Sequence, residues 1–330
     1  MYEFIGRLTA DSHAKRLVSL LCKWIPRWLQ AGFCQTMGRL LWWMASDATR
    51  ARIQRNMTDL LAYSDAGIIQ SVSRQYFANL ALTMYEILIG SDRLGKEGTG
   101  WFDVQGEENL EQALFVPNRN TGCIVYTPHV GNFFYYYWYL SRRYDCLTVA
   151  SAGSQELYPL YRKFQQMGCN GLDYDSTPPL EMYRTLKRHL AGGGIVFILG
   201  DFWRPNFPLS KLFGRTTRTP EGAAMLGLTD QVPIVPFYGY RTGLFRHQMI
   251  FEKPVHLYEM FHRNQKSEAN LLLNGFMEKV IKEHPSEWFY WFNADERWES
   301  ETKEQQEQQE QQEQQEQQEQ QEQQVPELAV

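Results

Sequence analysis

From about residue 102 onward, short apolar runs alternate with amphipathic segments, and glycine- or proline-containing turns separate them. Buried parallel strands read as continuous apolar runs, whereas helices carry apolar residues three or four positions apart. The pattern predicts strands at residues 102–104, 123–127, 147–150, 195–199, 232–238 and 249–251. It predicts helices at residues 109–114, 135–140, 155–167, 180–191, 219–229 and 268–284. This alternation is typical of an α/β fold with a mostly parallel central sheet flanked by helices.

The N-terminal pattern is different, because the mostly apolar stretch at residues 17–45 is interrupted by charges and by Pro26. It is too charged for a transmembrane helix, which needs about 20 apolar residues. We expect a pair of interfacial amphipathic helices, with tryptophans at headgroup depth and cations facing lipid phosphates. These residues are Trp24, Trp28, Trp42 and Trp43, with Lys23, Arg27 and Arg39. A packed helical hairpin of a soluble domain is the alternative.

Three parts of the chain are predicted from the pattern. Amphipathic helices at 49–62 and 65–89 precede a glycine-rich linker at 90–102. Near the other end, residues 304–324 are seven copies of Glu-Gln-Gln, which hold nothing apolar and cannot bury a core. The parts are a helical, membrane-associating region at 1–100, an α/β core at 101–300 and a low-complexity tail at 301–330.

Charge is distributed unevenly along the chain, which has a net charge of −5. Residues 304–330 hold eight Glu and no Lys or Arg, so the remainder carries −5 + 8 = +3. The first 60 residues hold nine basic and four acidic residues, a net charge of 9 − 4 = +5. A basic, tryptophan-rich segment fits an anionic membrane surface, although nucleic acid or mere solubility would fit its charge as well. The aromatic content of 14% favours an interface between apolar and wet surroundings. No nucleic-acid partner is expected.

Several classes of chemistry find no support in the sequence. The five cysteines are scattered without CxxC spacing, so we expect neither disulfides nor zinc, and a reducing compartment fits best. No GxSxG, P-loop or GxGxxG occurs at a strand–helix junction, which argues against serine hydrolysis and nucleotide binding through those motifs. No metal or cofactor is expected. The N-terminus also lacks the clean apolar core of a signal peptide.

The candidate chemistry centres on residues 127–134, Thr-Pro-His-Val-Gly-Asn-Phe-Phe, which follow a predicted buried strand. A histidine at this corner lies at the carboxyl end of a strand, where α/β folds place their active sites. A free imidazole, with a pKa of about 6.5, can take a proton from a hydroxyl near neutral pH. His129 is therefore the candidate general base, and a capping or core role is the alternative.

A general base needs a partner for its second ring nitrogen, and Asp201 is the best candidate. Asp201 follows the apolar strand at 195–199 in the way that His129 follows its own strand. If the two strands are neighbours, both side chains point into the same crevice. The alternative is that Asp201 caps the following turn, a common use of Asp.

A candidate anion site lies at residues 211–222, where cations precede a predicted helix N-terminus. Backbone amides and the helix dipole favour anions there, and Arg215 or Arg218 would add contacts to a phosphate. Arg204 and Arg241 also lie near strand ends and are expected to help. A solvated basic loop is the alternative.

Taken together, these features resemble the bacterial late lipid A acyltransferases, the lauroyl and myristoyl transferases of the lysophospholipid acyltransferase superfamily. The family's His-x-Gly-Asn-Trp-Glu stretch corresponds to residues 129–134, and its Asp after an apolar strand corresponds to Gly200-Asp201. Further matches are Leu212-Phe213-Gly214, Thr219-Pro220-Glu221-Gly222, residues 232–236 through Arg241, and Trp288-Phe289-Tyr290-Trp291 followed by Arg297-Trp298. The resemblance covers residues 15–298.

This resemblance implies a glycerol-3-phosphate/lysophospholipid acyltransferase-like fold at the cytoplasmic face of the bacterial inner (plasma) membrane. It implies transfer of an acyl chain from an acyl carrier protein or coenzyme A thioester to a hydroxyl of a membrane lipid. The histidine deprotonates the hydroxyl, which attacks the thioester directly, so no acyl-enzyme forms. The implied catalytic residues are His129 and Asp201, and the implied substrate contacts are Asn132, Arg204, Arg215, Arg218 and Arg241.

The chain departs from the family pattern at Phe134, where the family places an acid five residues after the histidine. Either Asp201 orients His129 instead, or His129 works without a carboxylate, or activity is lost. Related phosphatidylinositol mannoside acyltransferases are expected to use a carboxylate from the region of Asp201, which favours the first possibility. A non-catalytic relative that binds lipid or acyl carrier, and an acyl thioester hydrolase, are the other functions considered.

Overall fold

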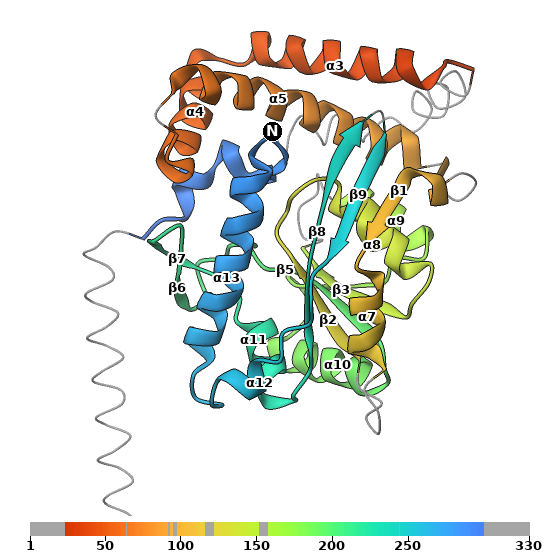
Figure 1. Cartoon of the computed structure of the whole chain (residues 1–330), viewed down its shortest axis with the longest axis vertical. Helices are drawn as coiled ribbons and strands as arrows, with labels where there is room; N and C mark the ends of the chain where they lie inside the picture. Colours follow the sequence, from red (N-terminus) through yellow and green to blue (C-terminus); the bar gives the residue numbers. More distant parts are fainter. Residues whose placement is uncertain are drawn as a thin grey trace, which may run out of the picture.

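The computed structural model describes residues 24–63, 65–91, 93–94, 98–115, 122–151, 158–243 and 245–299. Residues 17–23 of the predicted interfacial segment and the Glu-Gln-Gln tail therefore lie outside the described residues. A central sheet is flanked by helices, and the N-terminal helices among the described residues lie across one end of the molecule (Figure 1).

The central sheet has seven strands in the order β1-β9-β8-β2-β5-β3-β4. The strands are β1 (Phe102–Gln105), β2 (Cys123–Thr127), β3 (Cys146–Ala150), β4 (Gly171–Asp173), β5 (Ile195–Leu199), β8 (Ile234–Gly243) and β9 (Arg246–Phe251). Neighbouring strands are parallel except for β8 and β9, which form an antiparallel pair. The predicted α/β fold with a mostly parallel sheet is confirmed.

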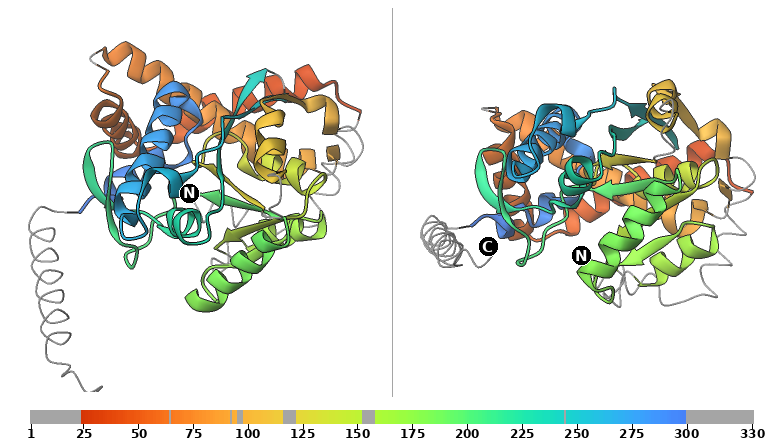
Figure 2. Two further views of the ribbon diagram at one scale, coloured as in Figure 1. Left: turned by 60° about the horizontal axis from the view of Figure 1, so that its bottom comes forward. Right: turned by 90° about the horizontal axis from the view of Figure 1, so that it is seen from below.

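Strand β2 lies at the centre, between β5 and β8, and all five of its residues are buried. Because side chains alternate across a sheet, Val125 packs with the aromatic residues of α8, and Ile124 packs on the opposite face with α11 and α13. The helices, seen from two further directions in Figure 2, are α7 (Glu107–Leu114), α8 (Phe133–Ser141), α9 (Tyr158–Gln166), α10 (Pro179–Ala191), α11 (Gly222–Thr229), α12 (Leu257–Met260) and α13 (Lys266–Glu283). Because apolar layers cover both faces of the sheet here, the sequence of β2 does not alternate between apolar and polar residues.

The N-terminal layer consists of α3 (Arg27–Met44), α4 (Asp47–Leu61) and α5 (Ala66–Tyr85), and α5 continues into a π-helical turn, η1 (Glu86–Gly90). Pro26 lies at the N-cap position of α3 and so directly precedes this helix. Helix α3 crosses close to α5 (Figure 1), because Gly38 has no side chain: a Cβ there would lie 2.5 Å from the Cα of Ala78. No helix among the described residues is long and apolar enough to cross a membrane.

Two segments that the sequence pattern did not predict as strands are strands in the structure. The basic segment after residue 208 forms a hairpin of β6 (Leu209–Leu212) and β7 (Arg215–Arg218). Its turn has positive φ angles at Phe213 (55°) and Gly214 (71°), as a two-residue hairpin turn requires. Residues 171–173 form the edge strand β4, which pairs with β3. In both cases pairing with a neighbouring strand overrides the local turn preference.

Candidate active site

The sheet topology brings His129 and Asp201 together. Strands β2 and β5 are parallel neighbours, with Thr127 opposite Leu199, so the residues that follow both strands meet at one sheet edge. Gly131 turns the chain from β2 into α8 with a φ of 66°, and a Cβ there would lie 2.6 Å from the carbonyl oxygen of Gly239. The corner that presents His129 therefore requires glycine two residues later.

His129 and Asp201 form a buried pair. The Nδ1 atom of His129 lies 2.5 Å from Oδ1 of Asp201, and the backbone N–H of His129 donates to both carboxylate oxygens at 3.0 Å. Trp288 donates its indole N–H to Oδ2 at 2.7 Å. Burial acts to raise the pKa of Asp201, but the attraction of His129 and these hydrogen bonds hold it below its usual value.

An ionised carboxylate only accepts hydrogen bonds, so the proton of a neutral His129 ring is placed on Nδ1. The opposite nitrogen, Nε2, is thereby the proton acceptor. The hydroxyl of Tyr290 lies 3.4 Å from Nε2, and both His129 and Tyr290 line a cavity. The geometry is that of an oriented general base facing a binding site.

The cavity has a volume of about 1360 Å³, more than the roughly 300–1,000 Å³ of most small-ligand sites. Its walls come from α5, the corner after β2, strands β3 and β5, α10 and the start of α11. Aromatic and aliphatic side chains dominate these walls. Phe134, which stands where the family has its acid, is one of them, and its ring packs on Phe133 (4.7 Å) and Phe164 (4.8 Å). Such a cavity suits a long apolar chain better than a polar small molecule.

A C-terminal segment completes the site, a role that the strand pattern of the sequence did not predict. The turns η3 (Pro285–Glu287), η4 (Phe289–Phe292) and η5 (Ala294–Arg297) cover the corner after β2. Gly131 donates its N–H to the carbonyl of Glu287 at 3.1 Å, and Phe289 donates to the carbonyl of His129 at 2.9 Å. Arg297 donates to the carbonyl of Asp201 at 3.3 Å. The dense aromatic run at 288–292 was the one sequence feature that could have indicated this role.

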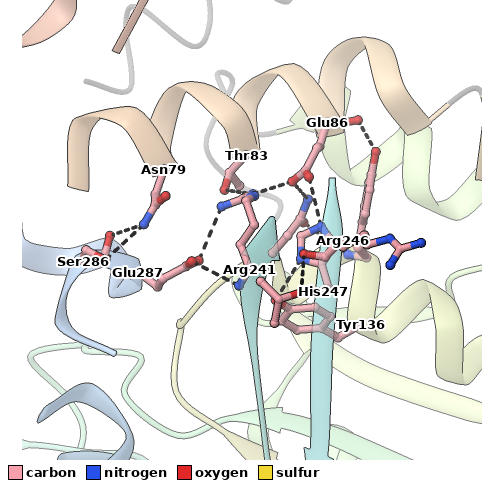
Figure 3. Close-up of polar contacts among 12 residues, drawn as sticks. Asn79, Thr83, Glu86, Tyr136, Arg241, Arg246, His247, Ser286 and Glu287 are labelled. Carbon is pink, nitrogen blue, oxygen red and sulfur yellow. Dashed lines mark hydrogen bonds and ion pairs between the residues drawn. The ribbon is translucent and has the colours of Figure 1, made fainter. Parts of the chain in front are cut away.

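A second polar network lies beside the site and is centred on Glu86, a residue that no sequence pattern had indicated (Figure 3). Its carboxylate accepts hydrogen bonds from Arg241 at 2.6 Å and from Asn132 at 2.9 Å, and it lies 2.9 Å from Nε2 of His247. Burial opposes ionisation, but Arg241 and His247 lower the pKa of Glu86 to about 2. Glu287 also contacts Arg241, and burial raises its pKa despite that contact.

This network accounts for two of the predicted substrate contacts. The side-chain oxygen of Asn132 accepts the N–H of Tyr135 and caps α8, while its amide binds Glu86. The guanidinium of Arg241 is 5% exposed and lies between Glu86 and Glu287. Neither residue is among the described residues that line the cavity. Their contact with substrate stays a prediction, and their observed partners give them a structural role.

The predicted anion site is dispersed in the structure. Arg218 is bound by Glu299 at 2.7 Å, and Arg215 lies on the exposed hairpin, 3.7 Å from Asp59. Both arginines belong to strand β7, which ends at Arg218, before α11 begins. Of the four predicted arginines, Arg204 is the one that lines the cavity, where Ser151 and Asp175 hold it at 2.9 and 3.3 Å. Substrate contacts by Arg215 and Arg218 remain untested predictions.

Known proteins share features with this chain. The model of the family described as bacterial lipid A biosynthesis acyltransferase matches residues 15–300. Comparison with curated proteins gives no significant match. Among solved structures, the 1-acyl-sn-glycerophosphate (LPA) acyltransferase PlsC from Thermotoga maritima is 13% identical, over 80% of this chain and 100% of that chain, with a TM-score of 0.39. The family match spans α3 through the C-terminal aromatic segment.

Proposed function

Since the chain belongs to the bacterial lipid A biosynthesis acyltransferase family and is an acyltransferase, we propose that it moves a fatty acyl chain from an acyl carrier protein or coenzyme A thioester to a hydroxyl of a (glyco)lipid, such as a lipid A precursor. The observation that carries this proposal is the 2.5 Å contact between His129 Nδ1 and Asp201 at the wall of the large apolar cavity.

In the proposed reaction, Nε2 of His129 takes the proton from the acceptor hydroxyl, and the hydroxyl oxygen attacks the thioester carbonyl carbon. The C–S bond then breaks, and Nε2 returns the proton to the departing thiolate. Asp201 stays ionised throughout and stabilises the imidazolium that forms between these steps.

Direct attack fits this cavity better than a covalent route through the protein. Cys169 is the cysteine that lines the cavity among the described residues. Burial raises the pKa of its thiol to about 12, so near neutral pH it is protonated and a poor nucleophile. An acyl-enzyme on this thiol is therefore not part of the proposed route.

His129 has a carboxylate partner even though residue 134 is Phe. Asp201, which follows the neighbouring strand, binds its Nδ1 atom. The ring of Phe134 instead extends the apolar wall that would hold the acyl chain. Arg204, whose guanidinium packs against the ring of Phe202 at 4.4 Å, is the cation placed to meet a phosphate of the donor or the acceptor.

The proposed lipid acceptor lies in a membrane, and α3 has the exposed apolar residues needed to bind a membrane surface. Its exposed apolar residues include Trp28 (63%), Phe33 (61%) and Trp43 (75%). Their spacing places them on one face of the helix, opposite the buried Ala31 and Cys34. A helix with outward-facing tryptophans and an exposed Arg39 fits the interface of the bacterial inner membrane, at its cytoplasmic face.

The test is an acyl-transfer assay with acyl carrier protein and coenzyme A thioesters, with and without lipid acceptors, followed by mass spectrometry. His129→Ala is expected to abolish transfer, while the control His262→Ala, at an exposed position, keeps it. Full transfer by His129→Ala would refute the proposal. Free fatty acid in place of acylated lipid would identify a hydrolase, and binding without thioester consumption would identify a non-catalytic relative.

A further inference from the structure

We propose that Tyr290 is a further catalytic residue, whose hydroxyl donates a hydrogen bond to the thioester carbonyl oxygen as that oxygen becomes an oxyanion. The inference rests on the acyl transfer proposed above. Acyl transfer develops negative charge on this oxygen, and enzymes stabilise it with donors that are already in place.

Tyr290 lies where such a donor is needed. Its hydroxyl is 3.4 Å from Nε2 of His129, and the two rings meet edge to face at 4.8 Å between centroids. Nδ1 of His129 is held by Asp201, so the acceptor hydroxyl has to bind at Nε2. The carbonyl carbon that this hydroxyl attacks is bonded to it in the intermediate, which brings the carbonyl oxygen within reach of the Tyr290 hydroxyl.

The Tyr290 ring is fixed from several sides. The guanidinium of Arg297 lies 4.6 Å from its centroid, and the rings of Phe289 and Trp288 lie 5.2 and 6.1 Å away. The hydrogen bond from the Phe289 N–H to the carbonyl of His129 ties this segment to the corner that carries the base. A donor held in this way needs little rearrangement at the moment of reaction.

Two other tyrosine hydroxyls of the cavity wall bind backbone carbonyl groups. Tyr76 donates to the carbonyl of Phe289 at 2.9 Å, and Tyr161 donates to the carbonyl of Gly171 at 2.9 Å. The hydroxyl of Tyr290 lies 3.4 Å from Nε2 of His129, the atom at which the substrate would react.

The proposed reaction needs only the donor thioester, the acceptor hydroxyl and the two side chains. The proton of the acceptor hydroxyl moves to Nε2 of His129, the new C–O bond forms, and the electron pair of the C=O bond moves to its oxygen. Tyr290 donates a hydrogen bond to this oxyanion and keeps its proton. The C=O bond then re-forms, the C–S bond breaks, and the thiolate takes the proton from Nε2.

Tyr290→Phe tests the proposal, because it removes the hydroxyl and keeps the ring on which Arg297 and His129 rest. We expect kcat to fall by about 10²- to 10³-fold, with KM changed by less than about threefold. Tyr258→Phe is a matched control, since the hydroxyl of Tyr258 also lies beside a histidine nitrogen (His256 Nδ1, 2.8 Å) but outside the cavity lining. This control is expected to keep the wild-type kcat.

A thioether analogue of the donor, which lacks the carbonyl, separates catalysis from binding. Its Kd should be the same for wild type and Tyr290→Phe, because the proposed hydrogen bond has no oxygen to reach. Wild-type kcat in Tyr290→Phe, alongside an inactive His129→Ala, would overturn the role of Tyr290 and leave the acyltransferase proposal intact. A rise in the thioether Kd that matches the fall in kcat would also overturn it, and a wild-type protein without transfer would overturn both proposals.

Discussion

Replacing Asp201 by Asn removes one charge from the centre of the site and changes its shape very little. The carboxylate accepts the backbone N–H of His129 on both oxygens, the ring Nδ1–H, and the indole N–H of Trp288. An amide has one accepting oxygen and one NH₂ group, so it cannot accept all of these hydrogen bonds. Either the NH₂ group faces Trp288, or it faces Nδ1.

The effect of each arrangement on stability or on kcat can be estimated. If NH₂ faces Trp288, a buried donor loses its partner, and stability falls by about 1–3 kcal/mol. If NH₂ faces Nδ1, the ring proton moves to Nε2 and the base is lost, which lowers kcat by about 10⁴-fold in the comparable change within a Ser-His-Asp triad. We expect a fall in kcat of at least about 10³-fold, with KM nearly unchanged and the fold retained.

The assay is acyl transfer under saturating donor and acceptor, together with urea unfolding from acid to neutral pH. Because the pKa of Asp201 is lowered in the folded protein, its contribution to stability is present above its usual pKa and lost as the pH falls toward the folded value. Asp201→Asn should lack this acid-dependent loss. Asp145→Asn is the control, since Asp145 also lies beside a histidine (His189, 3.8 Å) but is 80% exposed.

Retention of more than a tenth of the wild-type kcat by Asp201→Asn would refute the reasoning that Asp201 orients His129. Loss of the folded state in this variant would instead make Asp201 a structural residue. Wild-type activity in Asp145→Asn is required for either comparison, because it shows that removal of a carboxylate beside a histidine is not harmful in itself.

Three further outcomes are expected elsewhere in the molecule. Arg241→Ala removes the guanidinium that pairs with buried Glu86 and should lower the free energy of unfolding by about 3–5 kcal/mol in urea, whereas a loss below about 1 kcal/mol would contradict this network. Burial opposes ionisation of Glu86, but Arg241 and His247 lower its pKa from 4.5 to about 2. The free energy of unfolding should therefore decrease as the pH falls from 4.5 to about 2, and Glu86→Gln should weaken this pH dependence. Combined Trp28→Ala and Trp43→Ala substitutions should reduce binding to anionic lipid vesicles at least about tenfold without changing Tm, and unchanged binding would exclude α3 as the membrane face.

Much of the sheet was predictable because buried parallel strands must be apolar on both faces. Five-residue apolar runs such as the one before His129 are typical of buried parallel strands, and the structure confirms them as strands. The basic hairpin was not predictable from residues 209–218, since its strands form a separate two-stranded sheet and look like a polar loop in isolation. Local propensity decides little where a short strand lies outside the main sheet.

The candidate site was likewise predictable from the sequence only in part. The order of residues alone places His129 and Asp201 at the ends of apolar strands and puts Phe134 where the family has its acid. Folding is what makes these strands neighbours, and it thereby joins two residues that are 72 positions apart. It also brings Arg241 to Glu86, 155 positions away, because a buried guanidinium must meet a carboxylate whatever the distance along the chain.

The aromatic residues near the C-terminus show most plainly why the sequence alone could not predict the whole site. Their apolar character determined that they would be buried, but burial alone does not select a partner. Hydrogen bonds are directional, so the indole of Trp288 and the hydroxyl of Tyr290 were placed at Asp201 and His129 only once the chain had folded.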